Sequence, residues 1–277
     1  MNLFKTFLLM FSLFLLFMAM GKLIGGSSGM TFALIMAGIM NFIGYFFSDK
    51  IVLAMYRAKE ASESEFPNLH RMLNNLCQAS KLPKPKLYVV ESASPNAFAT
   101  GRDPKHASVA VTTGIIKLLS YDELEGVIGH ELAHIKNRDI LIATIAATIA
   151  AAITYIAHMA KWAAIFGGHR GGRGGHPLIL LVIAIIAPLA AMIIQLAISR
   201  SREYLADETG ARIVGSPNKL AGALEKLRLG VERKPWDVNP STAHMFIVNP
   251  LSGGFILQLF STHPPIEERV RRLRAML

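Results

Sequence analysis

Residues 130–139 read His-Glu-Leu-Ala-His-Ile-Lys-Asn-Arg-Asp, and an apolar run of membrane-spanning length starts at the next residue, Ile140. On a helix, His130 and His134 lie four residues apart on one face and point at one locus. Two imidazoles placed in this way can bind one metal ion. The stretch therefore predicts a metal-binding helix that stands just outside a membrane and continues into it.

Glu131 lies about 100° around the helix axis from the first histidine, so it can reach a water molecule at the metal without binding the ion. A catalytic zinc site uses three protein ligands and leaves a fourth position for water, whose pKa the metal lowers toward ~7. We therefore expect Zn²⁺, one ion per chain, with Glu131 as the general base.

The third ligand must come from elsewhere in the chain. A second apolar run ends at Ser199. If it returns antiparallel to the first, it brings Glu203 and Asp207 to the depth of the histidines. These carboxylates share a helix face, so one can bind the metal while the other holds a ligand imidazole. Asp139 is a rival, but on a continuing helix it points about 140° away from His134 and is expected to end the motif helix.

The residues before the motif predict a small α+β unit. A helix with one apolar face is expected over 60–80, and β-branched runs predict strands at Lys86–Glu91 and Ala107–Thr113. The loop between the strands could include an extended piece at Ala97–Thr100. Ser120 at the N-cap position and a glutamate three residues later predict a capping box at the start of the motif helix.

The composition places much of the chain in lipid. Of the 277 residues, 52% are hydrophobic and 17% are charged, whereas soluble domains carry about 25% charged residues. The mean hydropathy is +0.39, and a single cysteine excludes a disulfide scaffold. Four apolar runs come close to the ~20 residues that a helix needs to cross a membrane. They are Leu3–Met20, Met30–Phe47, Ile140–Ala160 and Leu178–Ser199.

These features predict an α-helical integral membrane protein with four transmembrane helices and an α+β zincin-like cytoplasmic metalloprotease domain. Residues 1–47 hold the first two spans, and 48–139 form a cytoplasmic protease segment with the motif helix. Residues 140–199 hold the other two spans, joined by a Gly-rich loop at 167–175. Residues 200–277 form a second cytoplasmic segment that completes the zinc site.

The net charge of +10 would suit a nucleic-acid binder, but its distribution does not, because no stripe of Lys and Arg alternates with aromatic residues. The basic residues near the spans gather on one side: Lys5, Lys50, Arg57, Lys59, Lys136, Arg138, Arg200, Arg202 and Arg212. The positive-inside rule then puts both termini and the active site in the cytoplasm. The expected surroundings are the lipid bilayer, with no nucleic acid among the partners.

Other interpretations stay open. The first run could be a cleaved signal peptide, but it has no clear small-residue cleavage site and a second run follows it closely. A zinc transporter or metal sensor could use the same histidine pair, yet transport calls for ionisable residues within the spans. Lys5 and His158 are the only Lys, Arg, Asp, Glu or His residues there, and Gln195 adds an uncharged amide. A catalytically dead membrane scaffold is disfavoured by the intact Glu131.

Four ordered motifs resemble those of the HtpX family of membrane-bound zinc metalloproteases, which is related to the CAAX prenyl endopeptidases. They are Ser94-Pro-Asn-Ala-Phe-Ala-Thr-Gly101, Gly129-His-Glu-Leu-Ala-His134, Ser199-Arg-Ser-Arg-Glu-Tyr-Leu-Ala-Asp207 and Ser261-Thr-His-Pro-Pro265. Four expected spans favour HtpX, since the prenyl-endopeptidase branch has more.

The resemblance implies roles for individual residues. Glu203 becomes the third zinc ligand, Asp207 supports the zinc site, and His263 stabilises the oxyanion near the metal. Arg202, next to the ligand, is a candidate for anchoring a carboxylate or the substrate, although it could equally be a cation at the membrane surface.

The resemblance also implies that Asn96 helps to hold the substrate backbone, and the neighbouring Ala97 and Phe98 are further substrate-binding candidates. Either this extended piece or the strand Ala107–Thr113 could accept the substrate as an added strand. Such pairing suits unfolded or misassembled membrane-protein substrates. The sequence thus predicts a zinc endopeptidase at the cytoplasmic face of the bacterial inner membrane, with a quality-control and stress-response role that rests on the resemblance alone.

Overall fold

The computed structural model describes residues 2–148, 200–236, 238, 240–249 and 264–276. Most of the third expected span and all of the fourth lie outside the described residues, as do the Gly-rich loop 167–175 and His263. The topology with four transmembrane helices therefore stays a prediction.

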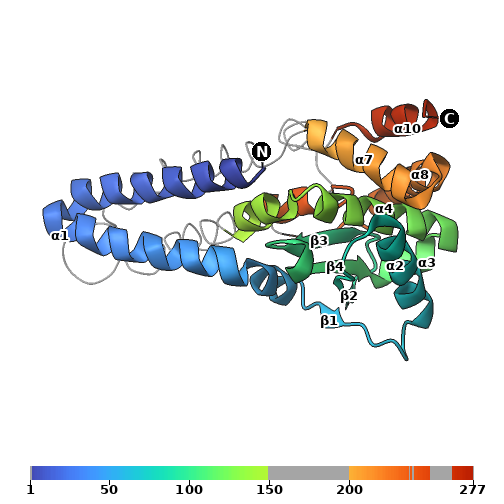
Figure 1. The fold of residues 1–277 in the computed structure, drawn as a ribbon, viewed down its shortest axis with the longest axis horizontal. Coiled ribbons are helices and arrows are strands. Elements are labelled where there is room, and N and C mark those ends of the chain that lie inside the picture. Colours follow the sequence, from blue (N-terminus) through green and yellow to red (C-terminus); the bar gives the residue numbers. More distant parts are fainter. Residues whose placement is uncertain (1, 149–199, 237, 239, 250–263, 277) are drawn as a thin grey trace.

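The chain begins with a long helix, α1 (Asn2–Met55), whose two arms run side by side and project away from the rest of the protein (Figure 1). The side-chain amide of Asn41 donates to the carbonyl of Met10 across the two arms, at 3.4 Å. Gly26 has a φ of +60°, which glycine adopts without strain. Within the described residues, Gly26–Met55 is the one helix long and apolar enough to cross a membrane, and it contains the second expected span.

The chain after α1 contains a four-stranded sheet with the strand order β1-β2-β4-β3. Its strands are β1 (Lys59–Glu60), β2 (Lys86–Val90), β3 (Ala97–Gly101) and β4 (Ala107–Thr112), and a 3₁₀ turn, η1 (Pro104–His106), joins the last two. β2 and β4 are parallel, whereas β1 and β3 are antiparallel to their neighbours. The expected strands and the extended piece are thus confirmed. Because β4 lies between β2 and β3, the alternative that it accepts a substrate strand is wrong.

Further helices pack around or beside this sheet in the described residues. They are α2 (Pro67–Ser80), α3 (Thr113–Leu118), α4 (Tyr121–Lys136), α7 (Arg200–Val214), α8 (Pro217–Arg233) and α10 (Ile266–Arg274), with a 3₁₀ turn, η2 (Pro240–Met245). α4 lies between the sheet on one side and α7 and α8 on the other (Figure 1). α2 begins later than expected, because residues 59 and 60 pair with β2 and Pro67 fits only the first turn of a helix.

The start of α4 is the predicted capping box. The hydroxyl of Ser120 accepts from the backbone N–H of Glu123 at 3.4 Å, and the Glu123 carboxylate accepts from the backbone N–H of Ser120 at 2.8 Å. These two bonds satisfy backbone donors that would otherwise have no partner at the helix start. They fix the first residue of the helix that carries the metal-binding motif.

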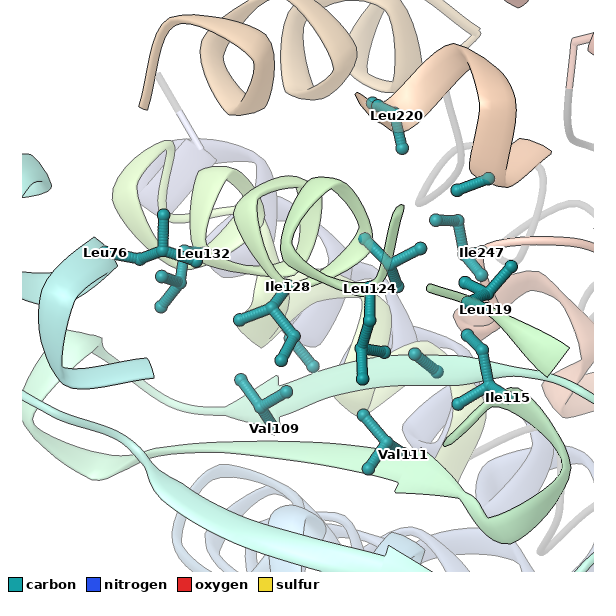
Figure 2. Packing of buried hydrophobic residues seen from close by; sticks show 14 of the residues in the cluster. Leu76, Val109, Val111, Ile115, Leu119, Leu124, Ile128, Leu132, Leu220 and Ile247 are labelled. Carbon is teal, nitrogen blue, oxygen red and sulfur yellow. The ribbon is translucent and has the colours of Figure 1, made fainter. Parts of the chain in front are cut away.

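The apolar face of α4 packs on the sheet. Leu124, Ile128 and Leu132 point toward Val109 and Val111 of β4 in the core (Figure 2). Ile128 and Leu132 have no exposed surface, and complete burial of such a side chain contributes about 1.5–3 kcal/mol to folding. This packing fixes the rotation of α4 about its axis, and therefore the direction in which its two histidines point.

Candidate active site

Three potential metal ligands meet between α4 and α7. Ligand atoms of His130, His134 and Glu203 all lie within 4.8 Å of one another. The two Nε2 atoms are 3.1 Å apart. Oε2 of Glu203 is 3.8 Å from Nε2 of His130, and Oε1 is 3.7 Å from Nε2 of His134. In a tetrahedral zinc site with bonds of about 2.0–2.1 Å, ligand atoms lie about 3.3 Å from one another. The residues present therefore fit a zinc ion.

Close contact of α7 with α4 brings Glu203 to the histidines. A Cβ atom built on Gly210 of α7 would lie 2.9 Å from both the backbone nitrogen and the Cα of His130. Real Cβ atoms do not approach backbone so closely. The glycine therefore permits the spacing of the two helices, and with it the position of a carboxylate ligand on a different helix from the histidines.

A buried ion pair holds His130 in place. Its Nδ1 lies 2.9 Å from Oδ1 of Asp207. Arg269 of α10 donates to both oxygens of that carboxylate, at 2.8 and 2.7 Å. Burial alone would raise the pKa of Asp207, but Arg269 outweighs it and the pKa is lowered. Asp207 is thus a stable acceptor for the proton on Nδ1, which leaves the Nε2 lone pair for a metal.

Asp139 holds the second histidine, against expectation. α4 ends at Lys136, Arg138 adopts a left-handed conformation with a φ of +56°, and residues 140–148 form a new helix. The motif helix thus ends in the polar run at 136–139, as expected, but the prediction that Asp139 points away from His134 is wrong. Both oxygens of Asp139 lie 3.1 Å from Nδ1 of His134, so this carboxylate orients the imidazole.

The histidine pair is poised for a cation. With Nδ1 of each ring beside a carboxylate, the two Nε2 lone pairs face each other, an arrangement that a shared cation or proton stabilises. Burial lowers the pKa of His130. Burial also opposes protonation of His134, but Asp139, Glu203 and Glu131 outweigh it and raise the pKa to about 10. A dication would replace that proton, because the metal ligand is the neutral imidazole.

Glu131 lies on the β3 side of the cluster, where its carboxylate accepts from the backbone N–H of Ala99. Burial raises the pKa of Glu131 to about 7, with a further contribution from Glu203, while His134 and Arg269 oppose the shift. A carboxylate with a pKa near neutrality is suited to accept and return a proton.

A cavity of about 40 Å³ lies at the cluster, which is room for only a few water molecules. It is lined by Ala99, His130, Glu131, His134, Asp139, Ile140, Ala143, Arg202, Glu203, His244, Met245, Phe246 and Ile247. Arg202 is the one expected substrate contact among them. Both of its terminal nitrogens are buried without a hydrogen-bond partner in the part of the chain that the structure describes, and burial lowers its pKa.

The other expected substrate contacts do not line this cavity. Ala97 and Phe98 are in β3, and the ring of Phe98 packs against the rings of Tyr56 and Phe246. Asn96 directly precedes β3, and its side-chain amide bonds to the backbone of Val248.

Sequence reasoning missed Arg269 and His244 and set Asp139 aside. Arg269 is 1% exposed, although arginine is almost never fully buried without a partner, and its partner Asp207 is 62 residues away in sequence. The polar run at 137–139 was a signal for the break that repositions Asp139. Nε2 of His244 donates to the carbonyl of Ala143 at 3.2 Å, and no local sequence pattern marks this histidine.

The family model of peptidase family M48 matches residues 63–277. A protease HtpX homolog of Thermodesulfovibrio yellowstonii is 63% identical over 274 residues, covering 98% of this chain and 97% of that protein. One of Syntrophotalea carbinolica is 56% identical over 280 residues, covering 100% and 99%. Among solved structures, Ste24p of S. mikatae aligns with a TM-score of 0.52 at 17% identity, and this chain covers 62% of it with 95% of its own residues.

The Ste24p likeness shows the fold alone, whereas the family match covers most of the chain and includes Glu131 and the three residues that could hold a metal ion. The chain thus belongs to peptidase family M48 and is a metalloprotease with a helix able to span a membrane.

Proposed function

We propose that the protein is a zinc endopeptidase that hydrolyses peptide bonds of unfolded or misassembled membrane proteins at the cytoplasmic face of the bacterial inner membrane. The observation that carries the proposal is the position of the buried Glu131 carboxylate beside the cluster of His130, His134 and Glu203. Two imidazoles and one carboxylate are a ligand set typical of catalytic zinc.

Bound at these three residues, zinc would supply a Lewis acid that polarises the scissile carbonyl and acidifies a water molecule. Glu131 accepts the proton of the attacking water at its carboxylate and delivers it to the leaving nitrogen. Asp207 and Asp139 keep the proton of each ligand imidazole on Nδ1.

Three further residues have proposed contacts with the substrate. Arg202 presents two buried guanidinium nitrogens at the cavity wall and would bind a carboxylate or carbonyl of the substrate. His263 would stabilise the oxyanion, a role that rests on its motif. Asn96 would hold the substrate backbone. The multi-pass topology and cytoplasmic orientation rest on the distribution of basic residues along the chain, and the quality-control role rests on the family resemblance.

The purified full-length protein in detergent tests the proposal. It should contain one zinc per chain, cleave an unfolded protein such as casein, stop when a chelator removes the metal and recover when zinc returns. Glu131→Gln should keep the zinc and lose cleavage, whereas Glu203→Gln should lose zinc. Glu208→Gln is the matched control, since Glu208 lies on the same helix but is paired with Arg212 at the surface. Cleavage that survives in Glu131→Gln would overturn the mechanism.

A further inference from the structure

The edge strand β3 is already paired with part of the same chain. The backbone N–H of Ile247 donates to the carbonyl of Ala97 at 3.1 Å. The side-chain amide of Asn96 donates to the carbonyl of Val248 at 2.8 Å and accepts from its N–H at 3.4 Å. One asparagine thus pairs with both backbone groups of a single residue, in the way that a neighbouring strand would.

These are the groups expected to hold a substrate. Asn96 cannot pair in the same way with a substrate backbone while Val248 is bound, because its side-chain oxygen already accepts from the N–H groups of both Ala97 and Val248, which uses both of its lone pairs. The carbonyl of Ala97 is likewise engaged. The adjoining cavity of about 40 Å³ is far smaller than the roughly 300 Å³ or more of ordinary ligand pockets. A peptide therefore cannot reach the zinc ligands in this arrangement.

Residues 242–248, Thr-Ala-His-Met-Phe-Ile-Val, form what we call the closing segment. All seven residues are buried, and four of them contribute to the wall of the cavity. The last four, from Met245 to Val248, are apolar. The segment thus has the composition of an apolar stretch of unfolded polypeptide, and its backbone takes the hydrogen bonds that such a stretch would need.

Contacts at both ends connect the closing segment to other functional parts of the molecule. Thr242 is hydrogen-bonded through its side chain to the hydroxyl of Tyr56, the residue that follows α1. The ring of Phe246 packs edge-on against Tyr56, with centroids 5.1 Å apart, and lies 5.4 Å from Phe98. At the other end, Arg269 donates to the carbonyl of Ile247 at 2.9 Å. The segment therefore joins the helix that can span a membrane to the residues that support the metal site.

We propose that the closing segment occupies the substrate-backbone site of β3, and that an extended apolar polypeptide binds by displacing it from Asn96 and Ala97. The inference rests on the proposed function. The structure is then that of the latent protease, in which the closing segment blocks the substrate site. Because Tyr56 follows α1 and bonds to Thr242, the stability of this blocked state depends on the position of the end of α1.

Amide hydrogen exchange tests the displacement directly. The zinc-loaded full-length Glu131→Gln protein in detergent is compared with and without a lysine-flanked peptide that copies residues 242–248. A peptide of equal charge, with serine in place of its Met, Phe, Ile and Val residues, is the control. With the copy peptide, exchange at the amides of Ile247 and Val248 should rise at least about fivefold, since their pairing to β3 is broken. The control peptide should change it little.

Protection of the bound copy peptide with unchanged exchange at residues 247 and 248 would overturn the inference. So would failure of the copy peptide to bind or to inhibit cleavage by the wild-type enzyme. Cleavage of casein by the wild-type enzyme is measured alongside. If casein is cleaved in either of these cases, the closing-segment inference falls while the proposed function stands. If zinc-loaded enzyme cleaves nothing, the proposed function itself fails.

A conservative variant gives a second, independent test. Tyr56→Phe removes the hydroxyl that bonds to Thr242 and keeps the ring, so the closing segment should open more often. We expect kcat/KM for peptide hydrolysis to rise about two- to fivefold, with KM lower and zinc content unchanged. Tyr45→Phe is the matched control, because Tyr45 lies on α1 and its ring packs against Phe46. Unchanged or lower kcat/KM in Tyr56→Phe, relative to this control, would contradict the proposal that the bond between Tyr56 and Thr242 holds the closing segment in place.

Discussion

The two ligand histidines lie one helical turn apart, yet different kinds of structure hold them. His130 depends on tertiary packing, since its carboxylate partner comes from α7 and is itself bound by Arg269 of α10. His134 depends on local chain geometry, because its partner Asp139 follows five residues later, after a break in the helix. The position of His130 therefore depends on the packing of three helices, whereas the position of His134 depends on a single turn of the chain.

The largest effect should come from Arg269, on the side that depends on tertiary packing. Arg269→Met leaves the buried carboxylate of Asp207 without its bidentate partner, and breaking a buried pair in this way costs about 3–5 kcal/mol. Unfolding in urea, followed by intrinsic fluorescence, measures the loss of unfolding free energy. Arg271→Met, exposed on the same helix, is the control and should change little. Equal stability of the two variants would show that the pair is not a structural support.

Gly210→Ala should disturb the same side through packing alone. Its new Cβ meets the backbone of His130, so α7 must shift, at a cost of about 1–3 kcal/mol and with weaker zinc binding. Gly222→Ala is the matched control, because a Cβ there comes no closer than 3.5 Å to the nearest atom of Glu123. Zinc content and urea unfolding are measured for both. A stable, zinc-loaded Gly210→Ala protein would contradict the packing argument.

Neutral substitutions of the two supporting carboxylates compare the two halves directly. Asp207→Asn and Asp139→Asn should each weaken zinc binding about 10–100-fold, the usual loss for such supporting groups. The loss should be greater for Asp207→Asn, since it also removes the anion that Arg269 binds with two hydrogen bonds and leaves it only Glu203, at 3.9 Å. Competition with a chromophoric chelator gives both affinities. An equal or larger loss in Asp139→Asn would reverse the comparison.

The smallest effect is on the pH dependence of zinc affinity, and it comes from His134, the histidine held by local chain geometry. The metal-free His134 has a pKa raised to about 10, so near pH 7 zinc binding must displace its proton. Zinc affinity should therefore increase about tenfold for each unit of rising pH between 6 and 8. The stability of the metal-free protein changes in the opposite direction and falls as pH rises. The pair with Asp139 stabilises the fold fully below about pH 6.5, and this contribution is lost as pH rises through about 10. Affinity measured across buffers, with Asp139→Asn as the control, checks the slope.

The same contrast explains how much the sequence predicts. The capping box, the strands and the shared face of His130 and His134 follow from short-range spacing, and the structure confirms them. The position of Asp139 could not be obtained by continuing a helix, because the direction of the chain changes at Arg138.

Residue spacing in the sequence could not predict hydrogen-bond partners that are far apart along the chain. The bonds from Arg269 to Asp207 and from Asn96 to Val248 join parts of the chain 62 and 152 residues apart. Only the packing of α10 and of the closing segment on the finished fold brings these groups together.

The break between α4 and the helix at 140–148 has a mechanical consequence. Membrane helices change their tilt when bilayer thickness changes. A continuous helix would transmit that rotation to the imidazoles of His130 and His134 as a torque. With Arg138 in a left-handed turn, the joint can absorb the tilt, while the core packing of α4 holds the ligands still. If the helix at 140–148 enters the membrane as the sequence predicts, a tilt of that helix need not turn α4 or its two histidines.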